Sequence, residues 1–277
     1  MKVILGDNQF FGINHVNQSK GDEDKSRFST TDSIIDFIET AIDQGLDGFM
    51  INANDHGFRI AQDKRFQSKE IHYSIPYPHK YANLVNEKGL LNALAIILSR
   101  QRLRSIGDMA AFCLGQNMHS LTRILISTEV PKRLPKGSRV YLQNIITDMI
   151  IGLDDAELLR TYIQKVRSLG YTPGFITLNP IKLDSMLSSL DMDLSDLMIC
   201  YNINNIGFNI FPSLEAVVAF TKKTTTYKKM GMSILASGAS SAHEAIEYIK
   251  QLPLDYIVFG SSNMDNIKSN LLQIRQN

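Results

Sequence analysis

The chain has 277 residues, of which 44% are hydrophobic and 21% are charged, a composition typical of folded globular proteins rather than disordered chains. Its 29 basic and 28 acidic residues leave a net charge of +1, so charge predicts neither a nucleic-acid partner nor an anionic membrane surface. Cys113 and Cys200 are too few for a disulfide scaffold, which favours a reducing, cytoplasmic location. The sequence holds no apolar run of about 18 residues and no signal peptide, so no membrane span is expected.

Short β-type runs alternate with helical patterns along the whole sequence. The expected strands cover residues 3–5, 48–53, 71–75, 140–147, 174–178, 197–201, 232–236 and 256–259. Alternation of this kind predicts a parallel sheet, and eight strand–helix units are the number found in a (β/α)8 TIM barrel. We therefore predict an α/β fold with one TIM-barrel domain over residues 1–277. A doubly wound open sheet is the alternative.

The helical patterns fill the spaces between these strands. One helix is expected from Thr31 to Gly45, another from Asp154 to Gly170, and a third from Ser241, which forms a capping box with Glu244. The charged segment 21–27 is expected to be a solvated loop. A long helical excursion, residues 81–137, lies between strands three and four and is a candidate lid, partner surface or homodimer contact.

Polar residues follow almost every expected strand. In a TIM barrel the carboxyl ends of the strands form the active site, so these residues should converge. The candidates for substrate binding are Asp7, Asn8, His15, Tyr77, Asn144, Asn179, Asn202 and Asn204. Each one alone suits a turn or a helix cap, but together they predict a polar cup for a polyhydroxylated or carbonyl ligand.

A smaller group carries the side chains that catalysis would need. The candidate catalytic residues are His56, Asp55, Asn52, Lys80 and Asp148. A carboxylate beside the imidazole could tune its pKa toward neutrality, and a desolvated lysine could act as an amine nucleophile. His15, Asp55, His56 and His79 lack the spacing of a metal motif, so no metal is predicted.

The last two strands lead into glycine- and serine-rich turns. Ser237 and Gly238 precede one helix, and Gly260, Ser261 and Ser262 precede the next. Glycine allows close approach of the backbone, and the N–H groups at a helix start favour a phosphate. The alternative is ordinary capping of two helices.

Residues 233–271, SILASGASSAHEAIEYIKQLPLDYIVFGSSNMDNIKSNL, resemble the final two units of the aldo/keto reductase superfamily. The resemblance implies a TIM barrel with a nicotinamide cofactor, NAD(P), or with no cofactor. The residues that would hold the adenosine phosphate end are Gly260, Ser261, Ser262, Asn266 and Asn270. Asn266 stands where the family often has a basic residue for the 2′-phosphate, which favours NAD over NADP.

The segment GLDGFMINANDHG, residues 45–57, is similar to the second strand of that family, but the family's catalytic tetrad is not matched. Asn52, or Asn54 on a shifted alignment, replaces the aspartate, and His56 replaces the tyrosine. No lysine lies on strand three, since Lys80 comes several residues late. The histidine position on strand four falls on Gln143 or Asn144.

Three functions follow as alternatives. The first is an NAD-type oxidoreductase that acts on a small polar carbonyl or sugar-derived compound, with or without a phosphate, and uses His56 as the proton donor. The second is a cofactor-free lyase, aldolase or isomerase that uses a Schiff base on Lys80 or proton transfer by His56 and Asp148. The third is a non-catalytic ligand-binding barrel.

Overall fold

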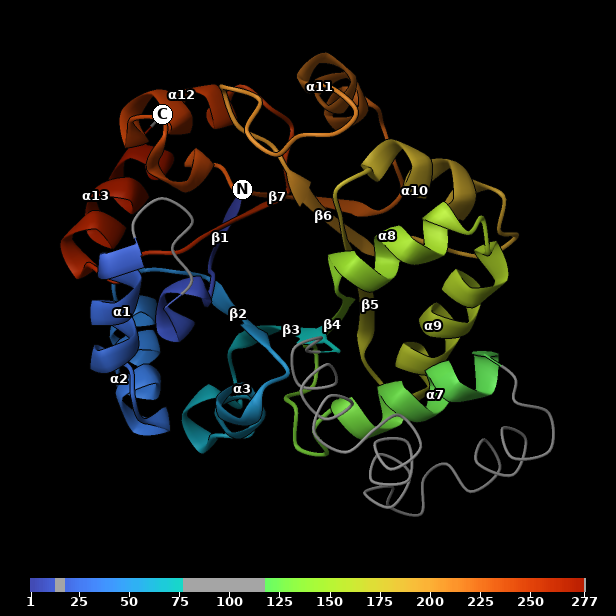
Figure 1. Cartoon of the computed structure of the whole chain (residues 1–277), viewed down its shortest axis with the longest axis horizontal. Helices are drawn as coiled ribbons and strands as arrows, with labels where there is room; N and C mark the ends of the chain where they lie inside the picture. The colour runs from blue at the N-terminus through green and yellow to red at the C-terminus, as the bar shows by residue number, and fades with distance from the viewer. Residues whose placement is uncertain (13–17, 77–117, 277) are drawn as a thin grey trace.

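The computed structural model describes residues 1–12, 18–76 and 118–276, and within them eight parallel strands close into a barrel surrounded by helices (Figure 1). The strands pair in chain order, and β1 closes the ring against β8. Their bounds are β1 (Lys2–Leu5), β2 (Gly48–Asn52), β3 (Glu70–Ile75), β4 (Arg139–Leu142), β5 (Thr172–Thr177), β6 (Met198–Asn202), β7 (Lys228–Met232) and β8 (Tyr256–Phe259). The predicted TIM barrel is confirmed.

Helices in the described part of the chain connect the strands. The α-helices are α1 (Gln18–Arg27), α2 (Thr31–Asp43), α3 (Asp55–Ile60), α7 (Met118–Glu129), α8 (Asn144–Gly152), α9 (Ala156–Ser168), α10 (Pro180–Ser188), α11 (Leu214–Lys222), α12 (Ala242–Lys250) and α13 (Met264–Arg275). Short 3₁₀ turns are η1 (Asn8–Phe11), η2 (Lys64–Phe66) and η4 (Ala236–Gly238). No helix of the described residues is both long enough and apolar enough to cross a membrane.

Most strand boundaries move by one or two residues, and three segments differ more clearly from the sequence prediction. Strand four ends at Leu142, and the apolar residues after it belong to α8, which buries Ile150 and Ile151 while Ile145 and Met149 are exposed. Strand seven is 228–232 rather than 232–236, because the positive φ of Ser233 ends the extended backbone. The expected loop 21–27 lies in α1, which carries too few apolar residues to show a helical pattern.

The capping residues of two helices lie one position away from the helix starts that the sequence indicates. The Thr30 side chain, not that of Thr31, accepts the N–H of Ser33, and Asp155 rather than Asp154 caps α9. Ser241 caps α12 as expected. Of the predicted excursion 81–137, residues 81–117 lie outside the described part, and α7 occupies 118–129.

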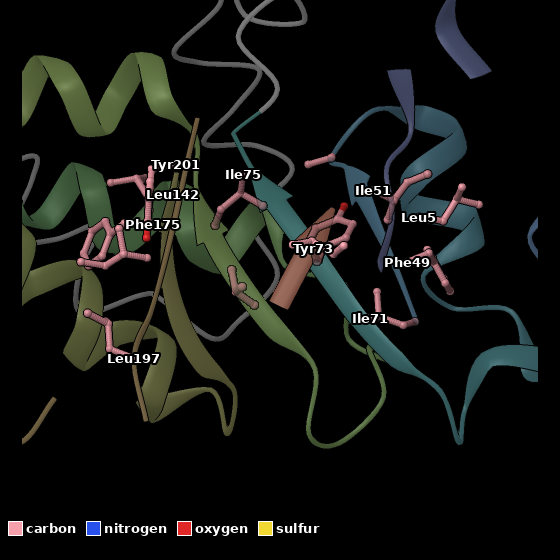
Figure 2. Close-up of a cluster of buried hydrophobic side chains, with 14 of the residues drawn as sticks. Leu5, Phe49, Ile51, Ile71, Tyr73, Ile75, Leu142, Phe175, Leu197 and Tyr201 are labelled. Atoms are coloured by element: carbon pink, nitrogen blue, oxygen red, sulfur yellow. The ribbon is translucent and has the colours of Figure 1, made fainter. Parts of the chain in front are cut away.

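Strand side chains alternate between two apolar layers. Outward-facing residues such as Leu5, Phe49 and Tyr73 pack under the helices (Figure 2). Inward-facing residues such as Ile4 and Met198 fill the barrel itself. Because the side-chain period along a strand is two, this alternation fixes which polar residues at the strand ends turn toward the barrel axis.

The amino-terminal end of the barrel holds a polar cluster that runs from the half-exposed Lys2 to the fully buried His72. The Lys2 Nζ lies 2.5 Å from Glu70 Oε2, and Nε2 of the fully buried His72 lies 3.3 Å from Glu70 Oε1. The other ring nitrogen of His72 is 2.8 Å from the Tyr141 hydroxyl. Burial opposes the charge on Glu70, but the bonds with His72 and Lys2 outweigh it and hold the pKa of that carboxyl well below its usual value.

Glu70→Gln should therefore lower the free energy of unfolding by about 2 kcal/mol at pH 7, since bonds to a charged group are lost. The folded-state pKa of Glu70 is depressed, so its stabilisation is present above the unfolded value of roughly 4.3 and is lost as the pH falls. Urea unfolding of both proteins across this range measures the difference. Glu157→Gln, at an exposed ion pair on α9, is the control and should cost less than about 0.5 kcal/mol. A difference between wild type and Glu70→Gln that does not shrink in acid would contradict the assignment.

Candidate functional site

At the carboxyl ends of the strands, three side chains form a hydrogen-bond chain that runs from β1 past β3 to β4. The Asp7 carboxylate accepts the backbone N–H of Asn52 at 2.8 Å and the Asn52 side-chain amide at 2.9 and 3.0 Å. The Asn52 Oδ1 in turn accepts a hydrogen bond from Gln143 Nε2. Asn52 continues the inward-facing positions of β2, and Gln143 follows β4 directly. We call this row the amide chain.

Asp7 is the buried acid of this end of the barrel, with 5% of its surface exposed. Burial raises the pKa of Asp7 to about 6, against the lowering effect of the hydrogen bonds from Asn52. The carboxyl therefore changes charge close to neutral pH. Its sequence-based assignment was substrate binding, and the geometry joins it to Asn52 of the predicted catalytic group.

Several buried polar atoms at this end have no hydrogen-bond partner among the described residues. They are Gln9 Oε1 after β1, Asn54 Nδ2 after β2, Ser74 Oγ on β3 and Asn205 Oδ1 after β6. A buried polar group without a partner costs about 1–3 kcal/mol, so such atoms suit a polar ligand or ordered water. Two are acceptors, one is a donor and the hydroxyl can be either.

His56, the predicted proton donor, lies at the start of α3. Its Nδ1 is 2.9 Å from the Thr31 hydroxyl of α2, and its ring centre is 6.3 Å from that of Phe11. Asp55 is exposed, and the structure gives no hydrogen bond between it and His56. The expected carboxylate–imidazole pair is thus replaced by a hydroxyl–imidazole pair, and the catalytic role of His56 stays a prediction.

Asp148 belongs to α8 and faces the outer side of β5. Its carboxylate accepts the Thr177 hydroxyl at 2.5 Å and the Leu178 backbone N–H at 3.1 Å. Burial raises the pKa of Asp148 against these hydrogen bonds. Because Thr177 alternates with the inward-facing Ile176, these contacts fasten the end of β5 from the helix side.

The predicted asparagines have different surroundings. Asn202 faces inward, accepts the Ser233 hydroxyl at 2.8 Å and donates to the Asn209 carbonyl. Asn204 is fully buried and holds the following loop through the backbone of Phe208. Asn179 caps α10, while Asn8 and Asn144 begin η1 and α8. Asn202 therefore lies at the same end of the barrel as the amide chain, Asn204 and Asn179 hold neighbouring loops, and their roles in substrate binding stay predictions.

The turn after β7 has open space beside its backbone, as an anion site would need. Ser237 and Gly238 have φ angles of 56° and 90°, and no heavy atom lies within 4 Å of the position that a Cβ would take at Gly238. The Asn263 side chain caps α13, and Asn266 on that helix is exposed while Asn270 is buried. Their binding roles stay predictions.

Two residues that the sequence did not single out position the turn after β8. The Arg27 guanidinium of α1 donates to the Ser262 carbonyl at 2.7 Å. A Cβ at Gly260 would lie 2.5 Å from Gln9 Oε1, so the absence of a side chain there admits Gln9. Ser261 closes the turn through mutual contacts with Asn263.

His15, Tyr77 and Lys80 lie outside the described residues. Within the described ranges, no group of three or more His, Cys, Asp or Glu side chains is placed to hold a metal ion. Ser74 and Gln143 could be found from the polarity of the strand ends, because each stands where a run of inward-facing strand residues ends. Gln9 and Arg27 had no such signal, because they act through contacts with the distant β8–α13 turn.

Comparison with known proteins finds structures of similar fold but no matching sequence family. No family model matches the chain, and no curated protein matches it. A solved Pseudomonas aeruginosa structure described as an aldo-keto reductase aligns over 98% of this chain and 88% of its own, with a TM-score of 0.57 and 14% identity. A thermostable aldo-keto reductase, solved in complex with the inhibitor epalrestat, aligns over 99% and 90%, with a TM-score of 0.60 and 13% identity. The chain is thus an aldo-keto-reductase-like TIM barrel in fold.

The pKa of Asp7 makes stability depend on pH. Because the folded-state pKa is raised above the ordinary 3.8, the protonated form is favoured by folding and the stabilisation is lost as the pH rises through about 6. Relative to Asp7→Asn, the wild type should lose up to about 3 kcal/mol between roughly pH 4 and pH 8. Urea unfolding at both pH values measures this, and the exposed Asp191→Asn provides the control. A wild-type-to-variant difference that stays constant would refute it.

The close approach of Gln9 to Gly260 can be tested with a double-mutant cycle. Gly260→Ala should destabilise the protein by about 1 kcal/mol, because the new methyl group displaces the Gln9 amide. In a Gln9→Ala background the same exchange should cost little. Gly152→Ala, with nothing within 4 Å of the added carbon, is the control. Additive effects of the two exchanges would show that the contact is absent.

Proposed function

We propose that this protein is an oxidoreductase of the aldo-keto reductase type that interconverts a small polar carbonyl or sugar-derived compound with its alcohol, using a nicotinamide cofactor. The observation that carries the proposal is the inward-facing row of polar side chains at the carboxyl end of a barrel with this fold. Asn52, Gln143 and Asn202 offer amide donors and acceptors, and Ser74 and Gln9 add unpartnered buried atoms. Such groups suit hydroxyl and carbonyl oxygens better than an apolar ligand.

The turns after β7 and β8 fit the phosphate groups of such a cofactor. The open space at Gly238 would admit the pyrophosphate, and the starts of α12 and α13 present backbone N–H groups. When bound, a nicotinamide ring supplies hydride transfer. The residues of this chain would orient the carbonyl group against it and provide the hydrogen bonds to its oxygen.

Arg27 bears on which cofactor is used. Asn266 lacks the positive charge that would favour NADP, but the Arg27 guanidinium lies beside Ser262 in the same turn. The positive charge of Arg27 comes from α1, whereas Asn266 lies on α13. The Arg27 guanidinium can face a phosphate on the cofactor. We propose that Arg27 fixes this turn and strengthens phosphate binding there.

Titration with NADH and NADPH, followed by nucleotide fluorescence and by thermal stabilisation, tests the proposal. The wild type should bind at least one of them, and Arg27→Gln should weaken binding about fivefold, as expected for the loss of roughly 1 kcal/mol. Arg160→Gln, at an exposed ion pair on α9, should leave affinity unchanged.

Absence of binding of both nucleotides at millimolar concentration would refute the oxidoreductase proposal. Borohydride treatment with small sugars then distinguishes the remaining functions, because a mass increase on Lys80 would indicate Schiff-base chemistry. An unchanged mass would exclude the Schiff base and leave proton transfer by His56 and Asp148 or the ligand-binding barrel.

A further inference from the structure

The amide chain has a direction that Asp7 imposes. A carboxylate only accepts hydrogen bonds, so the Asn52 NH₂ group must face Asp7. That places Asn52 Oδ1 toward Gln143, whose NH₂ group then donates to it. The Gln143 Oε1 remains as the acceptor at the far end of the chain, and among the described residues it has no hydrogen-bond donor.

Protonation of Asp7 would reverse the direction of the hydrogen bonds along the amide chain. Oδ2 holds the backbone N–H of Asn52 at 2.8 Å, whereas Oδ1 contacts only the side-chain amide, at 3.0 Å. Oδ1 is therefore the oxygen that can take the proton without losing the backbone bond. The new O–H can be satisfied by Asn52 Oδ1 after rotation of that amide, which turns Asn52 Nδ2 toward Gln143. Gln143 then accepts through Oε1 and turns its NH₂ group outward.

We propose that Asp7 is a proton switch that sets whether the mouth of the barrel presents a hydrogen-bond acceptor or a donor at Gln143. In the carboxylate state, Gln143 offers Oε1 and selects a hydroxyl group. In the acid state, it offers Nε2 and selects a carbonyl oxygen. One proton from solvent is added to Asp7, two amides rotate, and no covalent bond between heavy atoms changes. The choice of an alcohol–carbonyl pair as ligands rests on the proposed function.

The buried surroundings support a switch at this position. Ser74 pairs with Asn52 in the β2–β3 ladder, is 1% exposed, and has a hydroxyl without a partner among the described residues. A hydroxyl can donate or accept, so it is compatible with both orientations of the neighbouring amides. In a partly buried row of this kind, each amide depends on the next for its orientation.

Charged groups on neighbouring elements do not account for the titration of Asp7. The contributions to its pKa come from burial and from hydrogen bonds with Asn52 and the local backbone. Of the neighbouring elements, α3 carries Asp55 and His56, and α1 carries Lys25 and Arg27. His56 is engaged with Thr31, and Arg27 with Ser262. The switch should therefore follow the charge of Asp7 itself.

Nuclear magnetic resonance of the ¹⁵N- and ¹³C-labelled full-length chain tests the proposal without any ligand. From about pH 4.5 to pH 7.5, the side-chain amide signals of Asn52 and Gln143 should shift with one midpoint near 6, the same as that of the Asp7 carboxyl carbon. Asp7→Asn should abolish the pH dependence of both amide signals. Asn52→Ala should leave Asp7 titrating while the Gln143 signal becomes independent of pH.

Asp148→Asn is the matched control, because it removes a second carboxyl with a raised pKa that faces Thr177 instead of the mouth. It should leave the midpoints of Asn52 and Gln143 unchanged. Amide signals that stay constant while Asp7 titrates, or that still titrate in Asp7→Asn, would overturn the switch. The measurement contains no nucleotide, so a failure of NADH and NADPH binding would refute the proposed function and leave the switch standing.

Discussion

The pairing of β1 with β8 is the constraint on which the site depends. Lys2 to Leu5 register against Tyr256 to Phe259, and this parallel ladder turns an open sheet into a closed ring. In a closed parallel ring all carboxyl ends lie at the same rim, so Asp7, Asn52, Gln143 and Asn202 share one mouth although they are far apart in the chain. In an open sheet the same residues would lie along an edge.

The two ends of this barrel carry different electrostatics. The amino-terminal end holds an ion pair between Glu70 and Lys2, with the buried His72 beside it. The mouth is lined mainly by amides and hydroxyls, with Asp7 as the buried carboxyl joined to the amide chain. A neutral polar mouth can bind uncharged oxygens without the desolvation cost of a buried ion. The single acid then has a large influence, because no nearby charge in the described structure competes with it.

The sequence predicted the barrel and the polar rim because both depend on short-range patterns. Alternation of β-type and helical segments requires only local periodicity, and Asn52, Gln143 and Asn202 stand where an inward-facing run ends. The end of strand seven was missed, because Ile234 is buried within a turn and looks like part of a strand. The contact of Asp148 with Thr177 was also not predicted, because it joins the outer face of β5 to α8. Neither the Asp7–Asn52 bond nor the Arg27–Ser262 bond leaves a pattern in sequence, since each joins segments that only the closed ring brings together.

Arg27 gives the short helix α1 an importance beyond its size. This helix follows β1 (Figure 1), and most of its residues 21–27 are exposed. Through one guanidinium it fastens a turn 235 residues away in the chain. Since α1 contributes no strand and little of the core, its sequence is free to vary without disturbing the barrel. Natural variants or designed chimaeras that differ only in this helix could therefore acquire different nucleotide preferences while the hydrogen-bonding groups at the barrel axis stay the same.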